Sequence, residues 1–396
     1  MKIVVVGLGH VGLPIAIVLS QHYSVTAVDN NMEVIKQVKN RNNKYFNHPQ
    51  IDLKKLKLDV QKASTMIYRN ADIILIAVPT DLDKDGCALN TDILDSVLKM
   101  VSDSKTNATI IIKSTVPIGY TEKTKNFFNF KFLFFSPEFL REEHEVQDLL
   151  YPSRNILGCY SKKDTNVHEI NRRAEQFASV INECIVDKNK PFEFLGIGEA
   201  EAIKLFSNTY LALRISFFNE LDMYCEENGL NTFDIIKGVC EDERIGNTYN
   251  NPSFGFGGYC LPKDAKQLMF EFRNINNSII NAITTSNELR KKYIANKVLN
   301  LKAKNIGIYR LTSKKDATNL RCSATTDILS MLIAERDINV FVFEPYLKEG
   351  QYDGFVVINN LKEFKELSDL VIANRIDDDL EDIKLKIYSR DIMEKD

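Results

Sequence analysis

The stretch Ile3-Val4-Val5-Val6-Gly7-Leu8-Gly9-His10-Val11-Gly12 decides the fold of the first part of the chain. The apolar run before the glycines is typical of a buried parallel strand. The apolar segment Leu13–Ser20 that follows the glycines is typical of a helix, and a second strand-like segment, Ser24–Val28, ends on Asp29. This order of strand, glycine turn, helix, strand and acidic residue predicts a dinucleotide-binding βαβ unit.

The glycine loop and Asp29 each have a predicted task in that unit. Glycines permit a tight turn and a close approach of the backbone to a pyrophosphate. Asp29 is expected to accept a hydrogen bond from a ribose 2′-hydroxyl and to repel a 2′-phosphate, which favours NAD over NADP. The alternative is a glycine turn that binds no nucleotide. The loop residues expected at the cofactor are Gly7, Gly9, His10, Val11 and Gly12.

Alternating strand and helix patterns continue beyond this unit. The predicted strands are 72–78, 109–113, 132–135 and 183–187, and the predicted helices are 92–101 and about 164–180. Ligands of open α/β sheets bind beyond the carboxyl ends of the strands. Polar side chains follow such ends, although each one alone is more simply a surface residue. These side chains are Thr80, Thr115, Glu138 and Glu142.

A helical pattern runs from about Gly198 to Asn228 and meets Gly229, a natural stop signal. A helix of ~30 residues is roughly 45 Å long, and a helix of that length commonly connects two domains. Lys204 and Asn208 are one turn apart, so they share a face of this helix. The alternative for Lys204 is a solvated surface lysine.

The segment Phe254-Gly255-Phe256-Gly257-Gly258-Tyr259-Cys260-Leu261-Pro262-Lys263-Asp264 combines close-approach glycines, two rings that could wall a pocket, a thiol, a cation and a carboxylate. Pro262 suits the first turn of a helix. Cys260 is therefore expected near a helix N-terminus, where the dipole favours a thiolate. A glycine turn with a buried structural cysteine is the alternative.

The last part of the chain predicts a second, smaller doubly wound domain, with strands at Asn305–Tyr309, Asn339–Phe343 and Leu370–Ala373. No glycine fingerprint follows its first strand, so we expect it to bind a different ligand. The predicted class is α/β, with two doubly wound Rossmann-like domains joined by a long central helix. The predicted division is an NAD-binding domain at 1–196, a central helical region for dimerisation and the catalytic loop at 197–300, and a C-terminal domain at 301–396.

Composition excludes several classes of protein. The formal net charge of −3 offers no bulk attraction for nucleic acid. Seven cysteines without a C-x-x-C pair fit a reducing cytosol. No apolar run approaches the ~20 residues of a membrane span, and the first strand begins too early to leave room for a signal peptide. We expect a cytoplasmic protein without nucleic-acid, membrane or metal partners.

Five motifs together give the chain a resemblance to the UDP-glucose/GDP-mannose dehydrogenase family that runs essentially from end to end. They are Gly7-x-Gly9-x-x-Gly12, Lys113–Gly119 (KSTVPIG), Ser136–Glu142 (SPEFLRE), Glu199–Tyr210 (EAEAIKLFSNTY) and Gly257–Asp264 (GGYCLPKD). Within the fingerprint the chain departs from the family pattern at His10, where the family often has Tyr. The length and the ending Tyr388-Ser389-Arg390-Asp391 resemble the bacterial capsule-type members that act on UDP-glucose.

The resemblance implies that a sugar C6 alcohol is oxidised twice, with two NAD⁺ and one water, to give a uronate. Cys260 would capture the aldehyde as a thiohemiacetal, which the second oxidation converts to a thioester. Lys204 would stabilise the oxyanion with help from Asn208, and Asp264 would support acid–base chemistry. Thr115 and Glu142 would place and activate water, and Glu138 is a further catalytic candidate.

The resemblance also implies ligand contacts and a homodimer. The cofactor contacts outside the glycine loop would be Asp29, Thr80, Thr115, Glu142, Lys263 and Arg321. The substrate contacts would be Leu140, Arg141, Glu142, Lys204, Asn208, Tyr249, Asn250, Asn251, Pro252, Ser253, Gly257 and Lys314, and the C-terminal domain would bind the UDP-sugar. Arg244 resembles a residue that reaches the partner subunit's substrate. The apolar residues expected in a dimer interface on the long helix are Leu205, Leu211, Ile215 and Phe218.

Two other readings stay open at this point. GDP-mannose or a UDP-N-acetylhexosamine could replace UDP-glucose as the substrate, because the motifs separate these sugars only weakly. A non-catalytic NAD-binding protein on the same fold is a third possibility, against which the intact Cys260, Lys204 and Asp264 argue.

Overall fold

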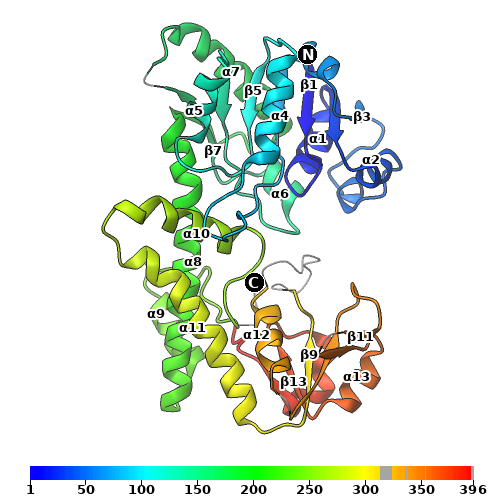
Figure 1. Ribbon diagram of the computed structural model, residues 1–396, viewed down its shortest axis with the longest axis vertical. Helices are drawn as coiled ribbons and strands as arrows, with labels where there is room; N and C mark the ends of the chain where they lie inside the picture. Colours follow the sequence, from blue (N-terminus) through cyan, green and yellow to red (C-terminus); the bar gives the residue numbers. More distant parts are fainter. Residues whose placement is uncertain (162, 313–322, 336, 353, 394–396) are drawn as a thin grey trace. The chain divides into compact units, whose positions relative to one another are not determined.

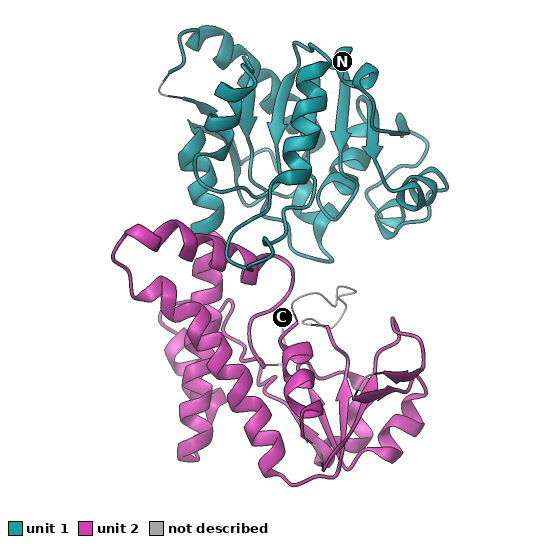
Figure 2. Ribbon diagram, viewed as in Figure 1, with its two compact units in different colours: residues 1–206 teal, residues 207–396 magenta. Residues whose placement is uncertain are grey.

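The computed structural model of the chain describes residues 1–161, 163–312, 323–335, 337–352 and 354–393 (Figure 1). The chain forms two compact units, residues 1–206 and residues 207–396 (Figure 2). Each unit contains a mainly parallel sheet covered by helices, so the predicted α/β class with two doubly wound parts is confirmed. The finer three-part division of the chain stays a prediction.

The sheet of the first unit has the strand order β3-β2-β1-β4-β5-β6-β7-β8. Neighbouring strands are parallel except at the β6–β7 pair. The part of this order that runs β3-β2-β1-β4-β5-β6 is the strand order found in dinucleotide-binding sheets. The strands are β1 (Lys2–Val6), β2 (Ser24–Asp29), β3 (Leu58–Lys62), β4 (Ile73–Ile76), β5 (Thr109–Ile112), β6 (Leu133–Phe135), β7 (Asn155–Tyr160) and β8 (Phe192–Gly196).

Both faces of this sheet are buried, which explains why its central strands are apolar at every position. Ile3 and Val5 pack into one core, and Val4 and Val6 pack into the other. Helices α1 and α7 contribute to the first core and α4 to the second. The helices are α1 (Gly12–Ser20), α2 (Met32–Lys39), η1 (Lys44–Asn47), α3 (Thr65–Arg69), α4 (Asp92–Asp103), α5 (Tyr120–Phe127), α6 (Glu145–Leu150) and α7 (Val167–Cys184).

The predicted strand at 183–187 is wrong. Helix α7 continues to Cys184, and the last strand of the sheet is β8, several residues later. Phe177, Val180 and Cys184 are all buried in the same core. Their spacing has the period of a helix, and this period extends into the beginning of the short apolar run that suggested a strand.

Helix α8 (Ile197–Asn228) confirms the predicted long helix. It ends before Gly229, whose φ of +63° is the left-handed conformation that commonly terminates helices. The boundary between the two units falls within α8, between Phe206 and Ser207. Helix α9 (Thr232–Cys240) follows after a short turn.

The second unit repeats the sheet architecture with the order β11-β12-β10-β9-β13-β14. Its three predicted strands are confirmed with their predicted bounds. Alternate residues of β13 again enter different cores, since Ile372 packs on one side and Val371 and Ala373 on the other. The strands are β9 (Asn305–Tyr309), β10 (Asn339–Phe343), β11 (Gly350–Tyr352), β12 (Phe355–Val357), β13 (Leu370–Ala373) and β14 (Ile387–Tyr388). The helices are α10 (Cys260–Glu271), η2 (Phe272–Asn274), α11 (Ile279–Asn300), α12 (Ala324–Ile333), α13 (Leu361–Leu367) and η3 (Asp378–Lys386).

Within the described residues, no helix combines the length and the apolar character that crossing a membrane requires.

Candidate functional site

The glycine loop between β1 and α1 has two kinds of glycine. Gly7 has a φ of +88°, and a Cβ atom on it would lie 2.5 Å from the carbonyl oxygen of Ala77. A Cβ atom on Gly12 would lie 1.8 Å from the carbonyl oxygen of Gly7. A Cβ atom on Gly9 would meet no heavy atom of the described residues within 4 Å. Packing within the protein therefore requires Gly7 and Gly12, whereas Gly9 borders open space in which a ligand can approach the backbone.

Asp29 lies at the end of β2 and faces this loop. Its carboxylate accepts hydrogen bonds from the backbone N–H of Leu8 at 2.9 Å and of Asn31 at 2.8 Å. Helix α1 begins at Gly12 without a side-chain cap from the described residues, so its N-terminus is suited to an anion. The cradle at Gly9, the helix N-terminus and the acidic residue fit the diphosphate and ribose of NAD.

Beyond β4 and β5, the structure brings Thr80 and Thr115 together. The buried Thr80 hydroxyl donates a hydrogen bond of 2.7 Å to the carbonyl oxygen of Thr115. The Ser114 hydroxyl donates to the carbonyl oxygen of Val78 at 2.7 Å. These bonds tie the two strand ends to each other, so both threonines lie at the carboxyl edge of the sheet, as the sequence predicted.

Glu138 follows β6 and is paired with a lysine that sequence reasoning had not singled out. Its carboxylate forms an ion pair with Lys113, which also donates to the Ser136 hydroxyl at 2.9 Å. The buried Lys204 of α8 donates instead to the main-chain carbonyl of Glu138 at 2.5 Å. Its ammonium also lies 5.4 Å from the centre of the Phe139 ring. Lys204 is thus a positioned buried cation rather than a solvated surface lysine, and Lys113 neutralises the nearby carboxylate.

The segment after Glu138 carries the remaining predicted contacts of the first unit. Arg141 forms an ion pair with Asp148, with an Nη2 to Oδ1 distance of 2.6 Å, and its backbone N–H donates to the same carboxylate. Leu140 and Glu142 are half-buried on either side of it. The Arg141 guanidinium is therefore engaged within this segment, and its predicted substrate contact stays a prediction.

In the second unit, Cys260 is the first residue of α10 and is exposed. Lys263 and Asp264 follow within its first two turns, so all three side chains lie at the amino end of the helix. The expected position of the thiol at a helix N-terminus is confirmed, and the alternative of a buried structural cysteine is wrong. Phe254 and Phe256 are buried in hydrophobic cores, so the idea that both rings wall a pocket is also wrong.

Asp264 is fully buried and connects two other predicted site residues. Asn208 donates from Nδ2 to one carboxylate oxygen at 2.6 Å, and the Lys263 ammonium lies 2.8 Å from the other. A buried carboxylate of this kind is tolerated because its charge and both oxygens are paired. The arrangement fixes the Asn208 amide next to α10, and it holds the Lys263 ammonium on Asp264.

Most polar side chains of the loop before Cys260 form hydrogen bonds with other parts of the protein. Asn251 donates to Asp391 at 2.6 Å and accepts from the backbone of Ile392 and Met393. Ser253 exchanges hydrogen bonds with Asn219. Asn250 and Pro252 are buried as well, whereas Tyr249 is 40% exposed with a φ of +50°. Predicted substrate contacts by the side chains of Asn250, Asn251 and Ser253 would compete with these internal bonds.

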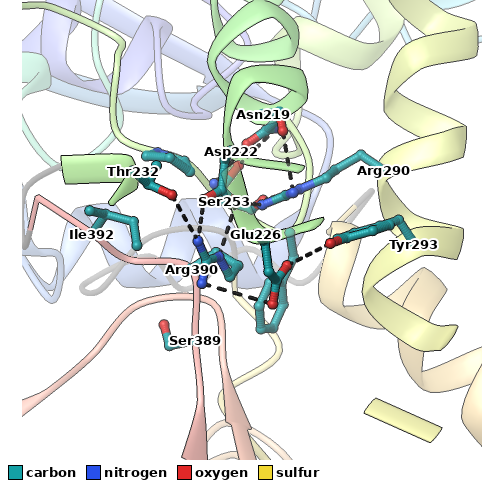
Figure 3. A network of polar contacts seen from close by, with 12 residues as sticks. Asn219, Asp222, Glu226, Thr232, Ser253, Arg290, Tyr293, Ser389, Arg390 and Ile392 are labelled. Atoms are coloured by element: carbon teal, nitrogen blue, oxygen red, sulfur yellow. Dashed lines mark hydrogen bonds and ion pairs between the residues drawn. The ribbon is translucent and has the colours of Figure 1, made fainter. Parts of the chain in front are cut away.

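A buried network behind this loop holds it in place (Figure 3). Arg290 of α11 donates to the Ser253 carbonyl at 2.9 Å and to Asp222 of α8 at 2.6 Å. Arg390, near the end of the chain, donates to the same Asp222. Asn287 of α11 also binds both main-chain polar groups of Phe256. Sequence reasoning missed Asp222, Arg290 and Asn287, since nothing in their local sequence marks them as partners of this loop.

Two predicted ligand contacts, Lys314 and Arg321, lie outside the described residues. Arg244 is exposed, and its guanidinium is bound by Asp242 at 2.5 Å. Gly257 is half-buried. In the part of the chain that the structure describes, no group of three or more His, Cys, Asp or Glu side chains is placed to hold a metal ion.

The first unit provides a glycine loop suited to a dinucleotide. The second unit provides an exposed thiol at a helix N-terminus. These features define a nicotinamide-dependent oxidoreductase with a candidate covalent step. Residues 1–175 match the NAD binding domain of the UDP-glucose/GDP-mannose dehydrogenase family, and residues 198–289 match its central domain.

Relatives that match over essentially the whole chain support the same family assignment. The chain is 40% identical to the UDP-glucose 6-dehydrogenase of Streptococcus pneumoniae, covering 99% of both chains. It is 42% identical to the enzyme of the same name from Campylobacter jejuni, covering 100% of both. A solved UDP-glucose dehydrogenase from Pyrobaculum islandicum has the same fold, with a TM-score of 0.85 at 22% identity, over 99% of this chain and 95% of that one. The chain belongs to the UDP-glucose/GDP-mannose dehydrogenase family, and its cofactor is NAD.

Proposed function

We propose that the protein oxidises UDP-glucose to UDP-glucuronate with NAD. The observation that carries this proposal is the 40–42% identity, over essentially the whole chain, to two proteins named UDP-glucose 6-dehydrogenase. The dinucleotide cradle and the exposed Cys260 at the start of α10 support it, because both are needed for a two-step oxidation that retains its aldehyde.

When bound, NAD would supply the hydride acceptor for each oxidation. Between the two oxidations, the Cys260 sulfur forms a bond to C6 of the aldehyde, the thiol proton passes to the aldehyde oxygen, and the product is a thiohemiacetal. Loss of the hydroxyl proton and of a second hydride from C6 gives a thioester at the same carbon. Water then attacks this carbon, the C–S bond breaks, and the thiol and the uronate are released. Glu142 is proposed as the base for this water, which Thr115 helps to place.

Lys204 is proposed to stabilise the negative charge that develops on the C6 oxygen. The role is supported by its burial and by its bond to the Glu138 carbonyl, because a fixed cation in a poorly hydrated place stabilises an oxyanion more than a mobile one. Asn208 is proposed as a second donor to this oxygen. Its amide is oriented by Asp264, so Asp264 acts through Asn208 and Lys263.

The three-part division of the chain is proposed from the similarity to the same two relatives. NAD would be bound by residues 1–196 and the UDP-sugar by residues 301–396. Residues 197–300 would carry the catalytic loop and the dimer contacts. The predicted contacts at Tyr249, Gly257, Lys314 and Arg321 belong to this proposal. A cytoplasmic location and a role in capsule polysaccharide synthesis complete it.

A homodimer is proposed with an interface on α8. Phe206, Tyr210, Phe217 and Tyr224 are each between 45% and 65% exposed, and the last three recur every seven residues along the helix. A stripe of exposed rings on one helix favours a protein partner over water, and a second copy of the chain would provide the same stripe. Leu205 and Phe218, which the sequence had suggested for this interface, are buried within the chain, so that choice was wrong.

The test is product stoichiometry with a panel of nucleotide sugars. Purified protein should form two NADH per UDP-glucose consumed, with UDP-glucuronate identified by mass spectrometry. UDP-N-acetylglucosamine, UDP-N-acetylmannosamine and GDP-mannose should react far more slowly. A single NADH per sugar, or a clear preference for another sugar in the panel, would overturn the assignment.

A further inference from the structure

His10 is the residue of the glycine loop that follows Gly9, and its ring belongs to a polar cluster built from three separate segments. The ring Nδ1 lies 3.2 Å from Glu145 Oε1 and 3.2 Å from the Tyr45 hydroxyl. The Tyr45 hydroxyl donates to the same Glu145 oxygen at 3.0 Å. Lys44 lies 3.8 Å from the other oxygen of Glu145 and 2.6 Å from Glu143.

The geometry determines that Nδ1 of the His10 ring carries a proton. Glu145 is a carboxylate with a side chain only 3% exposed, and the single Tyr45 proton is used in its bond to that carboxylate. His10 Nδ1 therefore faces two oxygen atoms that can accept a proton, so Nδ1 carries the hydrogen. Among the described residues, the ring makes its polar contacts through Nδ1. The ring is 54% exposed, which leaves Nε2 available to a ligand of the glycine loop.

Charges around the ring favour its cationic form. The hydrogen bond with Glu145 raises the pKa of His10 above its ordinary value of 6.5, and burial opposes this effect. The charges of Glu145 and Glu142 raise it further, while that of Lys44 lowers it. The pKa of Glu145 is lowered despite burial, because His10, Tyr45, Lys44 and its own backbone stabilise the carboxylate. The pKa of Tyr45 is raised by burial and by Glu145, so the phenol remains protonated.

We propose that Glu145 and Tyr45 are positioning residues that hold His10 as a cation beside the diphosphate of NAD. The glycine loop and the N-terminus of α1 supply backbone donors for this diphosphate, and His10 Nε2–H supplies a charged one. The cation has a second effect, because it screens the diphosphate from the Glu142, Glu143 and Glu145 carboxylates in the adjoining segment. This inference rests on the NAD-dependent activity proposed above.

The consequence is a pH-dependent affinity for NAD. Protonated His10 binds the diphosphate, so affinity is highest below the pKa of His10 and falls as the pH rises through it. Loss of one charge-assisted hydrogen bond to a partly exposed site corresponds to roughly a tenfold weaker affinity. Adenosine, which has no phosphate, should bind with the same affinity on both sides of the transition.

The experiment measures equilibrium affinity for NAD⁺, ADP-ribose and adenosine by calorimetry from acidic to alkaline pH. The full-length protein is compared with His10→Gln, Glu145→Gln and, as a matched control, His168→Gln, an exposed histidine of α7. The imidazole resonance of His10 is titrated by NMR in parallel. We expect the pH transition for NAD⁺ and ADP-ribose to disappear in His10→Gln, to move to lower pH in Glu145→Gln, and to be unchanged in His168→Gln.

Two results would overturn the inference. One is an NAD⁺ affinity whose pH dependence is the same with and without His10. The other is a His10 resonance that titrates at the same pH in Glu145→Gln as in the unmodified protein. Failure of the unmodified protein to bind NAD⁺ at any pH would instead refute the proposed function, so the two failures are distinguishable. If Glu145→Gln does not fold, Tyr45→Phe removes one member of the cluster while keeping the buried carboxylate.

Discussion

Replacing Asp222 by alanine should destabilise the second unit strongly. Asp222 of α8 is fully buried, and its carboxylate binds two arginines, Arg290 from α11 and Arg390 from near the end of the chain (Figure 3). Arg290 is itself buried, and after the substitution its hydrogen bonds to the main-chain carbonyls of Asn219 and Ser253 and its contact with the Tyr293 ring would remain, with no carboxylate to neutralise it among these partners. Arg390 would keep Glu226 at 4.0 Å and the Thr232 hydroxyl at 3.4 Å.

The expected loss in free energy of unfolding is about 3–5 kcal/mol, the range for removing one partner of a buried ion pair. That amount is a large share of the ~5–15 kcal/mol by which a protein is typically stable. Asp222→Asn should lose less than Asp222→Ala, because an amide oxygen can still accept one of the hydrogen bonds. Asp382→Asn is the matched control, since Asp382 is largely exposed and pairs with Lys365 at the surface.

Urea denaturation followed by circular dichroism measures these losses; the chain has no tryptophan to report by fluorescence. NAD⁺ binding, which is proposed to involve the first unit, is followed in the same samples to separate the unfolding of the two units. If the free energy of unfolding of Asp222→Ala lies within about 1 kcal/mol of that of the unmodified protein, the reasoning is refuted, because an ion pair at the surface already contributes up to about 1 kcal/mol.

The pH dependence of this network has a defined sign. Burial opposes ionisation of Asp222, but the hydrogen bonds and charges of Arg390 and Arg290 lower its pKa below the ordinary 3.8. A lowered pKa in the folded state gives a contribution to stability that is complete above the unfolded pKa and is lost as the pH falls through the folded one. The stability difference between Asp222→Asn and the unmodified protein should therefore be constant at neutral pH and shrink only in acid below about pH 4.

Further predictions concern the proposed chemistry and assembly. Asp29→Ala should narrow the preference for NAD⁺ over NADP⁺ by about tenfold, the effect of removing a repulsion of ~1.4 kcal/mol; an unmodified protein that uses both cofactors equally contradicts this. Cys260→Ala should bind NAD⁺ normally but form UDP-glucuronate at least roughly a thousandfold more slowly, and a near-normal rate would exclude the thiol as nucleophile. Glu142→Gln should accumulate an acyl-enzyme, seen as added mass on the Cys260 peptide; no added mass despite NADH formation would remove Glu142 from the hydrolysis step. Phe217→Ser with Tyr224→Ser should convert a dimer to a monomer in light scattering, whereas an unmodified protein that is already an active monomer would refute the interface.

Local sequence determined the parts of this protein that depend on neighbouring residues. The glycine fingerprint specified the first βαβ unit, because the turn needs the positive φ of Gly7 and brings Gly12 against the Gly7 carbonyl five residues earlier. Short buried strands such as Asn339–Phe343 were placed correctly because an apolar run in a two-sided sheet needs no partner to be recognised. The position of Cys260 at a helix start followed from Pro262 two residues later.

Tertiary structure alone decided which side chains of these elements are buried and which polar groups they pair with inside the protein. Helix α8 has apolar residues around most of its circumference, so its sequence did not indicate that Leu205 and Phe218 are buried while Phe206 and Phe217 are exposed. Asn251 is a predicted substrate contact, and only the folded chain shows that its amide donates to Asp391, which is far away in sequence. His10 and Glu145 likewise lie on segments that only folding brings together. Periodicity reports the local conformation of a segment, but the partner of a polar group depends on which distant segment packs against it.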